Sequence, residues 1–202
     1  MDQILYWNDV ALEANKVSHT TGIDKGVLGP TLSSRALAII VHLAMYDAYV
    51  GTTSGTGLSS YLGIPAGPAG TTNAAISGAA FTALSKLFPS QVAYFGQKLS
   101  ESGSTGLEDG FVYGVSVANA IMADRAADPD ASSYGYTAPT GRGAHKPDPD
   151  NPDQGIYAPF YGARCKCFSV GTRFTLDPPP AFGTPKYEAA ETQVREKELP
   201  LN

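Results

Sequence analysis

Apolar residues recur at helical spacing over most of the chain up to residue 128. The first stretch begins after Asp2, a typical N-cap residue, and its spacing predicts a helix. A second helix, opened by Ser33 or Ser34 and running to about Val50, is apolar over most of its circumference. That pattern is typical of a buried central helix. The apolar positions of the first helix are Ile4, Trp7, Val10, Ala11, Ala14 and Val17.

Three further helices are predicted after a loop at residues 51–70, which is rich in Gly, Ser, Thr and Pro. The first has Thr72 as its N-cap and is stopped by Pro89. The second opens at Ser90, and the third spans residues 107–127. The apolar stripes of these last two helices consist of Val92, Phe95 and Leu99, and of Phe111, Val115, Ala118, Ile121 and Met122.

Between residues 129 and 185, Pro, Gly and aromatic residues replace the helical pattern. A disordered linker is poor in aromatic residues, whereas this segment is rich in them. We therefore expect an extended arm packed over a folded surface, since a loop of this length in a compact domain is uncommon and usually functional or held in place. The aromatic residues of the arm are Tyr134, Tyr136, Tyr157, Phe160, Tyr161, Phe168 and Phe174.

A final helix is predicted over residues 186–202, highly charged and with a thin apolar side. The predicted fold is therefore all-α, a bundle of about five to six helices with a long arm. Its parts are a helical core at 1–128, the extended arm at 129–185 and the charged C-terminal helix at 186–202. The thin apolar side of that helix consists of Tyr187, Ala190 and Val194.

Charged residues make up 16% of the chain, below the roughly 25% of an average soluble domain. Either Ser, Thr, Gly and Tyr supply the polar surface, or another polypeptide covers part of it. The formal net charge of −5 and the absence of Lys and Arg runs argue against a nucleic-acid partner. The longest apolar stretch, residues 36–44, is far too short for a transmembrane helix. Since Met1, Asp2 and Gln3 provide no basic start for a signal peptide, we expect a soluble chain in an unknown compartment.

Two separated blocks, one within residues 4–49 and one within residues 157–179 that contains Ala-Pro-Phe-Tyr-Gly, resemble the N-terminal part of the vanadium-dependent chloroperoxidases, which share a helical architecture with acid phosphatases. The resemblance extends from Ile4 to about Glu196, and its most specific element is Ala-Pro-Phe-Tyr-Gly at residues 158–162. The first block consists of residues 4–8, Leu12, Glu13, residues 15–20, Gly29, Pro30, residues 34–37 and residues 42–49. The second consists of residues 157–162, Lys166, Phe168, Phe174 and residues 177–179.

The resemblance implies a scaffold rather than a catalytic centre. In that family a Lys and an Arg-Pro, a Pro-Ser-Gly-His stretch, and a Ser-Arg followed by Gly-x-His hold vanadate, all in the C-terminal half. This sequence has no Arg-Pro and no Pro-Ser-Gly-His, because Pro89-Ser90 continues into Gln91. We therefore expect no catalytic, cofactor-binding or metal-binding residue in this chain. The resemblance implies vanadate only in a complete assembly.

One segment superficially matches the missing site, with Ser34-Arg35 followed by His42 and Asp47. The spacing differs from the family pattern by about one residue at His42 and about two at Asp47. Arg35 and His42 share a helix face and could together hold an oxyanion. A hydrogen-bonded Arg and His on a buried helix is the more ordinary outcome. Asp47 could pair with either of them or cap a neighbouring backbone.

The other chemically capable residues favour structural roles. His19 lies near a helix end, where a cation complements the helix dipole, and His145 lies in a solvated loop. No residue order supports a Ser-His-Asp triad. Cys165 and Cys167 are too close for an unstrained disulfide and too few for zinc, so we expect reduced thiols. The acidic stretch lacks the Gly and Glu of a calcium loop and is expected to be a solvated turn. Its members are Asp148, Asp150, Asn151 and Asp153.

Two functions follow as competing hypotheses. The chain could supply the N-terminal half of a haloperoxidase-like assembly, completed by a second polypeptide or a C-terminal half bearing the vanadate site. Alternatively, it could be a non-catalytic module derived from that family and used for assembly into a homo-oligomer. The low charge content favours a partner in either case.

Overall fold

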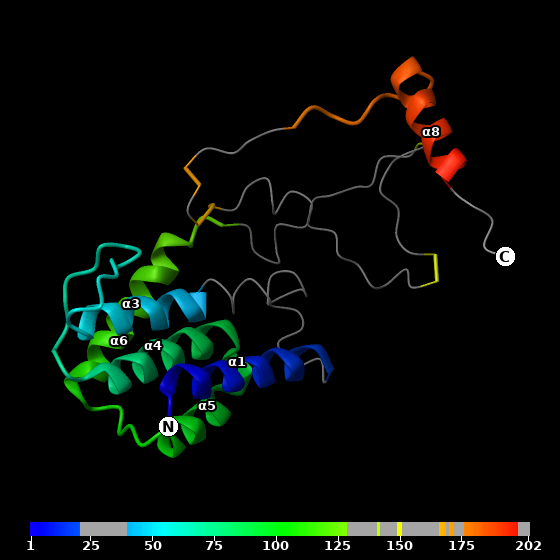
Figure 1. Cartoon of the computed structure of the whole chain (residues 1–202). Helices are drawn as coiled ribbons and strands as arrows, with labels where there is room; N and C mark the ends of the chain where they lie inside the picture. Colours follow the sequence, from blue (N-terminus) through cyan, green and yellow to red (C-terminus); the bar gives the residue numbers. More distant parts are fainter. Residues whose placement is uncertain are drawn as a thin grey trace. The chain divides into compact units, whose positions relative to one another are not determined.

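The computed structural model describes residues 1–20, 40–128, 141, 149–150, 166–168, 170–171 and 176–197 (Figure 1). Within these ranges every regular element is helical, which confirms the predicted all-α class. The α-helices are α1 (Gln3–Thr20), α3 (His42–Thr52), α4 (Thr72–Leu87), α5 (Val92–Glu101), α6 (Asp109–Asp124) and α8 (Pro185–Lys197), with a 3₁₀ turn η2 (Pro89–Gln91) before α5.

The chain divides into two compact units, unit 1 (Met1–Lys166) and unit 2 (Cys167–Asn202). Unit 1 contains every described helix except α8. The predicted division at residues 128 and 185 stays a prediction, because most of the arm lies outside the described residues. None of the described helices combines the length and the apolar character needed to cross a bilayer.

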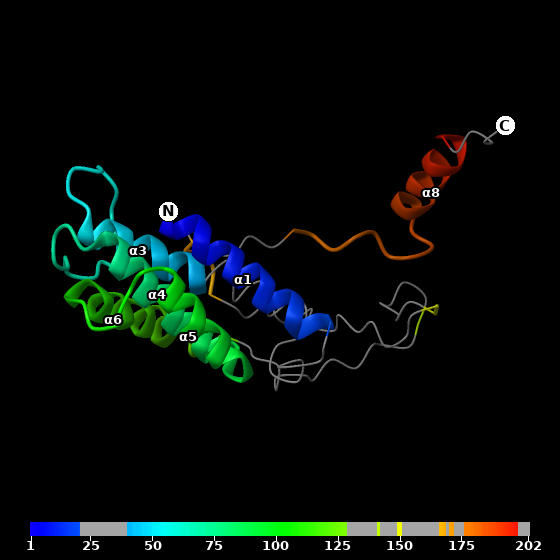
Figure 2. The same ribbon diagram turned by 90° about the horizontal axis from the view of Figure 1, so that it is seen from below.

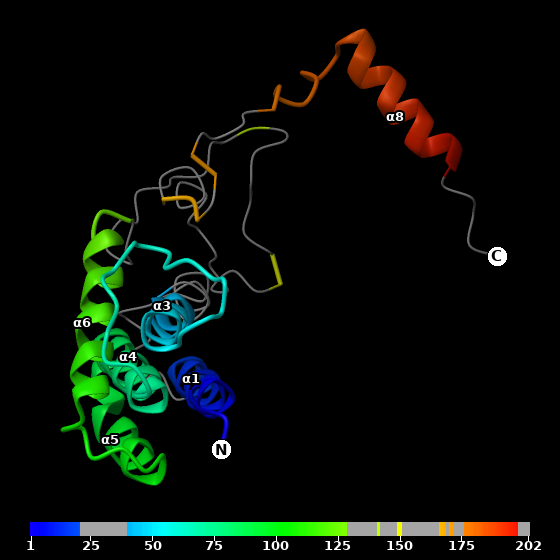
Figure 3. The same ribbon diagram turned by 60° about the vertical axis from the view of Figure 1, so that its left-hand side comes forward.

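Helix α4 is the centre of unit 1 and contacts α1, α3, α5 and α6. Figure 3 shows α1, α3 and α4 next to one another, with α6 along one side. The buried positions of α4 are mostly small, and Ala75, Ala79, Ala80 and Ala83 are all fully inaccessible. Small side chains keep the surface of the helix close to its backbone, so four neighbours can surround a single helix.

The contact between α4 and α6 is closer than side chains would allow. A Cβ atom at Gly78 would lie 2.2 Å from the carbonyl oxygen of Phe111, and one at Gly114 would lie 2.0 Å from that of Ala75. No real Cβ approaches a carbonyl oxygen so closely, so only glycine fits at these two positions. The two helix backbones therefore pack directly against each other.

Helix α1 is fixed at its start by capping and by a buried polar chain. The side chain of Asp2 accepts the N–H groups of Ile4 and Leu5, at 2.9 and 3.1 Å, as predicted for an N-cap. The indole N–H of Trp7 donates to the Ser77 hydroxyl at 3.1 Å. That hydroxyl donates to the side-chain oxygen of Gln3 at 3.2 Å, and the Gln3 side-chain nitrogen donates to the carbonyl oxygen of Ser102 after α5 at 3.2 Å, so these buried polar atoms are all paired.

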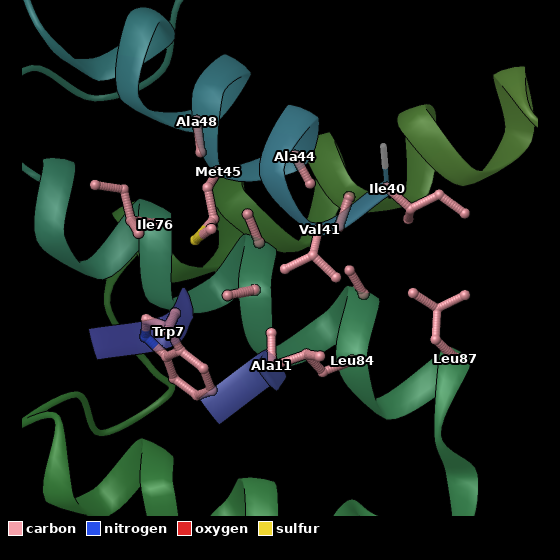
Figure 4. Close-up of a cluster of buried hydrophobic side chains, with 14 of the residues drawn as sticks. Trp7, Ala11, Ile40, Val41, Ala44, Met45, Ala48, Ile76, Leu84 and Leu87 are labelled. Atoms are coloured by element: carbon pink, nitrogen blue, oxygen red, sulfur yellow. The ribbon is translucent and has the colours of Figure 1, made fainter. Parts of the chain in front are cut away.

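The hydrophobic core lies where α1, α3 and α4 meet (Figure 4). Trp7 of α1 is fully buried, Met45 of α3 is 1% exposed and Leu84 of α4 is fully buried. In Figure 4 Met45 lies beside Ile76 of α4. The buried position predicted for the second helix holds for its described part, α3.

Three details of the helix predictions were wrong. Thr72 is the first residue of α4 rather than its N-cap, and its hydroxyl instead donates to the carbonyl oxygen of Thr52 at 3.3 Å. Val92, assigned to the inner face of α5, is 42% exposed, because the inward position at this point is taken by Gln91 of the 3₁₀ turn, which is buried and donates to the carbonyl oxygen of Ala14 at 3.0 Å. The buried stripe of α6 runs through Gly114 and Val117, and Val115 is only half-buried, because α4 approaches α6 at the glycine.

We predict that Gly114→Ala destabilises unit 1 by about 1–3 kcal/mol or more, because its methyl group would overlap the Ala75 carbonyl. Gly96→Ala is the matched control, since a Cβ at that position of α5 meets nothing within 4 Å. The control should gain roughly 0.5–1 kcal/mol from helix propensity. Urea unfolding followed by helical circular dichroism measures both, and equal stability of the two variants would contradict the direct backbone contact.

Candidate functional site

The buried carboxylate of Asp47 organises the loop at residues 53–71. Asp47 lies on α3 with no exposed surface and accepts the backbone N–H groups of Tyr61 at 2.5 Å and Leu62 at 3.1 Å. Of the alternatives predicted for Asp47, the described residues show the capping of a neighbouring backbone. Arg35 lies outside the described residues, and His42 places its Nε2 atom 3.1 Å from the side-chain oxygen of Asn8 on α1.

The same loop is held at further points around the end of α3, where Figure 2 shows it between α3 and α4. The backbone N–H of Gly67 donates to the carbonyl oxygen of Gly51 at 2.9 Å. Tyr113 of α6 donates its hydroxyl to the carbonyl oxygen of Pro65 at 2.9 Å. A Cβ at Gly67 would lie 2.6 Å from the Tyr113 ring, so the ring packs flat against bare backbone. Burial, with a smaller contribution from the Asp47 charge, raises the pKa of Tyr113.

A second buried charge, the guanidinium group of Arg125, is also bonded to the 53–71 loop. Arg125 follows the last residue of α6 and is only 4% exposed. Its guanidinium donates to the Tyr61 hydroxyl at 2.6 Å and to the carbonyl oxygen of Lys166 at 2.6 Å. The carboxylates of Asp124 and Asp128 lie 3.6 and 3.7 Å from guanidinium nitrogens. Arg125 thus joins the 53–71 loop to a segment of the predicted arm.

Lys166 is held on several sides. Its backbone N–H donates to the Asp128 carboxylate at 2.5 Å, and its ammonium group pairs with the Asp124 carboxylate. Since its carbonyl oxygen accepts from Arg125, both polar atoms of its backbone are bonded to residues at the end of α6. We call Asp47, Tyr61, Arg125, Lys166 and the two aspartates the latch network.

The latch network is suited to holding chain segments and not to binding an oxyanion. Its two cations, Arg125 and Lys166, face the two carboxylates of Asp124 and Asp128, so no excess positive charge remains. Vanadate is an anion and needs cationic donors directed at it. Among the described residues, no three His, Cys, Asp or Glu side chains gather as they would around a metal ion.

An open pocket of roughly 230 Å³ lies between the starts of α1 and α4 and the turn before α6. Glu108 lines it and also lines a neighbouring hollow of roughly 400 Å³. The Glu108 carboxylate accepts the N–H of Thr105 at 2.8 Å and the hydroxyl of Ser104 at 3.0 Å. The hydrogen bond from the Thr105 backbone N–H has the largest effect, and together with the Ser104 bond it lowers the pKa of the Glu108 carboxyl to about 2. A lining carboxylate that is ionised at neutral pH makes both spaces unsuitable for an anion such as vanadate.

The sequence did not single out Arg125, and of its partners only Lys166 was named, as part of the resemblance. A signal was present, because Asp124, Arg125 and Asp128 follow a stretch of α6, residues 110–123, that carries no charge. The tertiary partners Tyr61 and Lys166 could not be inferred from spacing. His19 lies within α1 as predicted, Asp150 is exposed, and Cys167 is a free, half-buried thiol. The remaining candidates, His145, Asp148, Asn151, Asp153 and Cys165, lie outside the described residues.

Comparison with known proteins gives two matches. The family model described as vanadium chloroperoxidase N-terminal domain matches residues 1–159. The chain is also 31% identical over 238 aligned residues to the vanadium chloroperoxidase of Curvularia inaequalis. That similarity covers 93% of this chain but 38% of the Curvularia protein. The chain thus spans well under half the length of the relative that it matches.

We predict that Arg125→Met destabilises unit 1 by about 3–5 kcal/mol, because it leaves the carboxylates of Asp124 and Asp128 without their buried partner. Lys16→Met is the control, since the Lys16–Glu13 pair is exposed and should contribute no more than about 1 kcal/mol. Urea unfolding measures both changes. Limited proteolysis should also cut the variant near Lys166, and an unchanged cleavage pattern would argue against the latch network.

The depressed pKa of Glu108 predicts a pH-dependent contribution to stability. Because the folded-state pKa is about 2, the contribution is complete above the ordinary value near 4.5 and is lost as the pH falls toward 2. Glu108→Gln should therefore be less stable than the parent chain at pH 7 and equally stable near pH 2. Urea unfolding across this range measures the difference, and a pH-independent gap would show that Glu108 acts through packing alone.

Proposed function

This chain belongs to the family of the vanadium chloroperoxidase N-terminal domain, and we propose that it forms the helical scaffold of a vanadium-dependent haloperoxidase-like protein. The vanadate site, and with it the oxidation of halide by hydrogen peroxide, would lie in polypeptide that this chain does not contain. One observation carries the proposal. The similarity runs along 93% of this chain yet accounts for 38% of the relative.

The chemistry of the described residues supports a scaffold role. An oxyanion that takes part in catalysis needs preorganised donors with net positive charge. The donors of Arg125 are directed at Tyr61, Lys166 and two carboxylates, and the pocket beside α4 carries the charge of Glu108. Pro-Ser-Gly-His is absent from the sequence. We therefore assign no step of halide oxidation to a side chain of this chain.

What these residues would contribute is rigidity. A site held to within a fraction of an ångström needs supporting elements that do not shift. The direct backbone contact of α4 with α6 fixes the centre of the bundle, and the latch network fixes the 53–71 loop and Lys166 to that centre.

A non-catalytic oligomerisation module is the alternative, and one feature of α1 favours it. Leu5 and Leu12 are 64% and 54% exposed and lie seven residues apart, so they share the outer face of the helix. A second copy of the chain could cover such a stripe. Size-exclusion chromatography separates the alternatives, since a stable homo-oligomer of the isolated chain would favour the module.

We predict that the isolated chain, supplied with orthovanadate, hydrogen peroxide and chloride or bromide, shows no vanadium-dependent halide oxidation. The Curvularia vanadium chloroperoxidase under the same conditions is the positive control. A chimera that joins this chain to the part of the Curvularia protein outside the similarity should oxidise halide when vanadate is added. Vanadium-dependent turnover by the isolated chain would overturn the proposal, and so would an inactive chimera that folds and binds vanadate.

A further inference from the structure

Unit 2 contains a helix, α8, whose ends are well specified but which buries none of its own residues. Thr184 is its N-cap, accepting the N–H of Tyr187 at 3.3 Å, and Pro185 occupies the first helical position. Glu188 in the first turn and Arg195 in the last turn complement the helix dipole. The ends of α8 are therefore set by local sequence, yet none of its residues is buried.

A helix of this length is not expected to persist by itself. α8 has 13 residues, and isolated helices below about 12–15 residues are marginal in water even with favourable sequences. Its apolar stripe of Tyr187, Ala190 and Val194 lies on one face, and the Phe182 ring packs edge-on against Tyr187 at 4.7 Å between centroids. Stable helix formation therefore requires a surface that covers this stripe.

The rest of unit 2 exposes further apolar groups. None of its described residues is buried, and several of its large apolar side chains are exposed. A short amphipathic helix preceded by apolar residues is the typical form of a segment that docks in a groove of a partner. These exposed side chains are Phe168, Val170, Leu176, Phe182 and Val194.

The comparisons with known proteins indicate which polypeptide would cover the α8 stripe. The match to the N-terminal domain ends at residue 159, close to the boundary between the two units. The similarity to the Curvularia enzyme covers 93% of the chain, so it must extend beyond unit 1 into unit 2. Unit 2 thus lies outside the matched N-terminal domain, and at least part of it lies inside the region shared with a much longer protein.

We propose that unit 2 is a docking segment whose α8 stripe packs into an apolar groove of the vanadate-bearing polypeptide, a role that rests on the scaffold function proposed above. Unit 1 would then be complete without α8, and unit 2 would connect it to the catalytic part. The polar side of α8, with its Glu191–Arg195 ion pair at 2.6 Å, would remain in water.

Hydrogen exchange of the α8 amides tests the docking. In the isolated chain at low concentration we expect these amides to exchange almost freely while those of α4 are protected. In the chimera with the remaining Curvularia segment, α8 should exchange at least about a hundredfold more slowly. Protection of the α8 amides in the isolated chain would overturn the docking. Protection that does not depend on chain concentration would show that unit 1 covers α8. Protection that rises with chain concentration would show that a second copy of the chain covers it.

Paired variants in the chimera test which face is used. Val194→Asp should make the α8 amides exchange at least about tenfold faster, because it places a charge in the covered stripe. Thr192→Asp introduces the same charge on the opposite, exposed face and should change protection less than about twofold. Equal effects of the two variants would overturn the proposed face.

Activity is recorded separately. A chimera that oxidises halide while its α8 amides exchange freely would overturn the docking and leave the scaffold function intact. An inactive chimera with protected α8 amides would support the docking and contradict the scaffold function.

Discussion

The direct contact of two helix backbones, α4 against α6, is the constraint on which the rest of unit 1 depends. It exists because Gly78 and Gly114 leave space for carbonyl oxygens of the opposite helix. Dispersion forces act over short distances, so a close approach along two helices stabilises the pair without large side chains. The alanine-rich sides of α4 then remain available to α1, α3 and α5, and large buried side chains lie on these neighbours, such as Trp7 of α1, Met45 of α3 and Phe95 of α5.

Two buried charges extend this order to segments without regular structure. Asp47 uses its carboxylate to bind backbone N–H groups of the 53–71 loop, and Arg125 uses its guanidinium to bind the same loop and Lys166. A buried charge without partners is costly, so each fixes its segment in the one arrangement that supplies them. The 53–71 loop and Lys166 are thus positioned by electrostatics, whereas the described helices of unit 1 are positioned by the fit of their surfaces.

Much of the helical fold could be predicted from the sequence, because periodicity and capping are local. Asp2, Pro89 and the buried character of α3 followed from such signals, and the resemblance to the chloroperoxidases identified the family. The latch network could not be predicted, since Arg125 meets Tyr61 and Lys166 only through the tertiary fold. Thr72 and Val92 were misassigned for the same reason, because the loop beside α4 and the turn before α5 decide their surroundings.

The position of Met45 in the core has a consequence for the scaffold role proposed above, in which the chain would work beside an oxidant. Peroxides and hypohalous acids convert accessible thioethers to sulfoxides, and a sulfoxide in a packed core disrupts it. Met45 is 1% exposed among α1, α3 and α4, so the sulfur whose oxidation would be most damaging is shielded by the fold. Met1, 81% exposed and ahead of the first turn of α1, would be oxidised first and at little cost to the bundle.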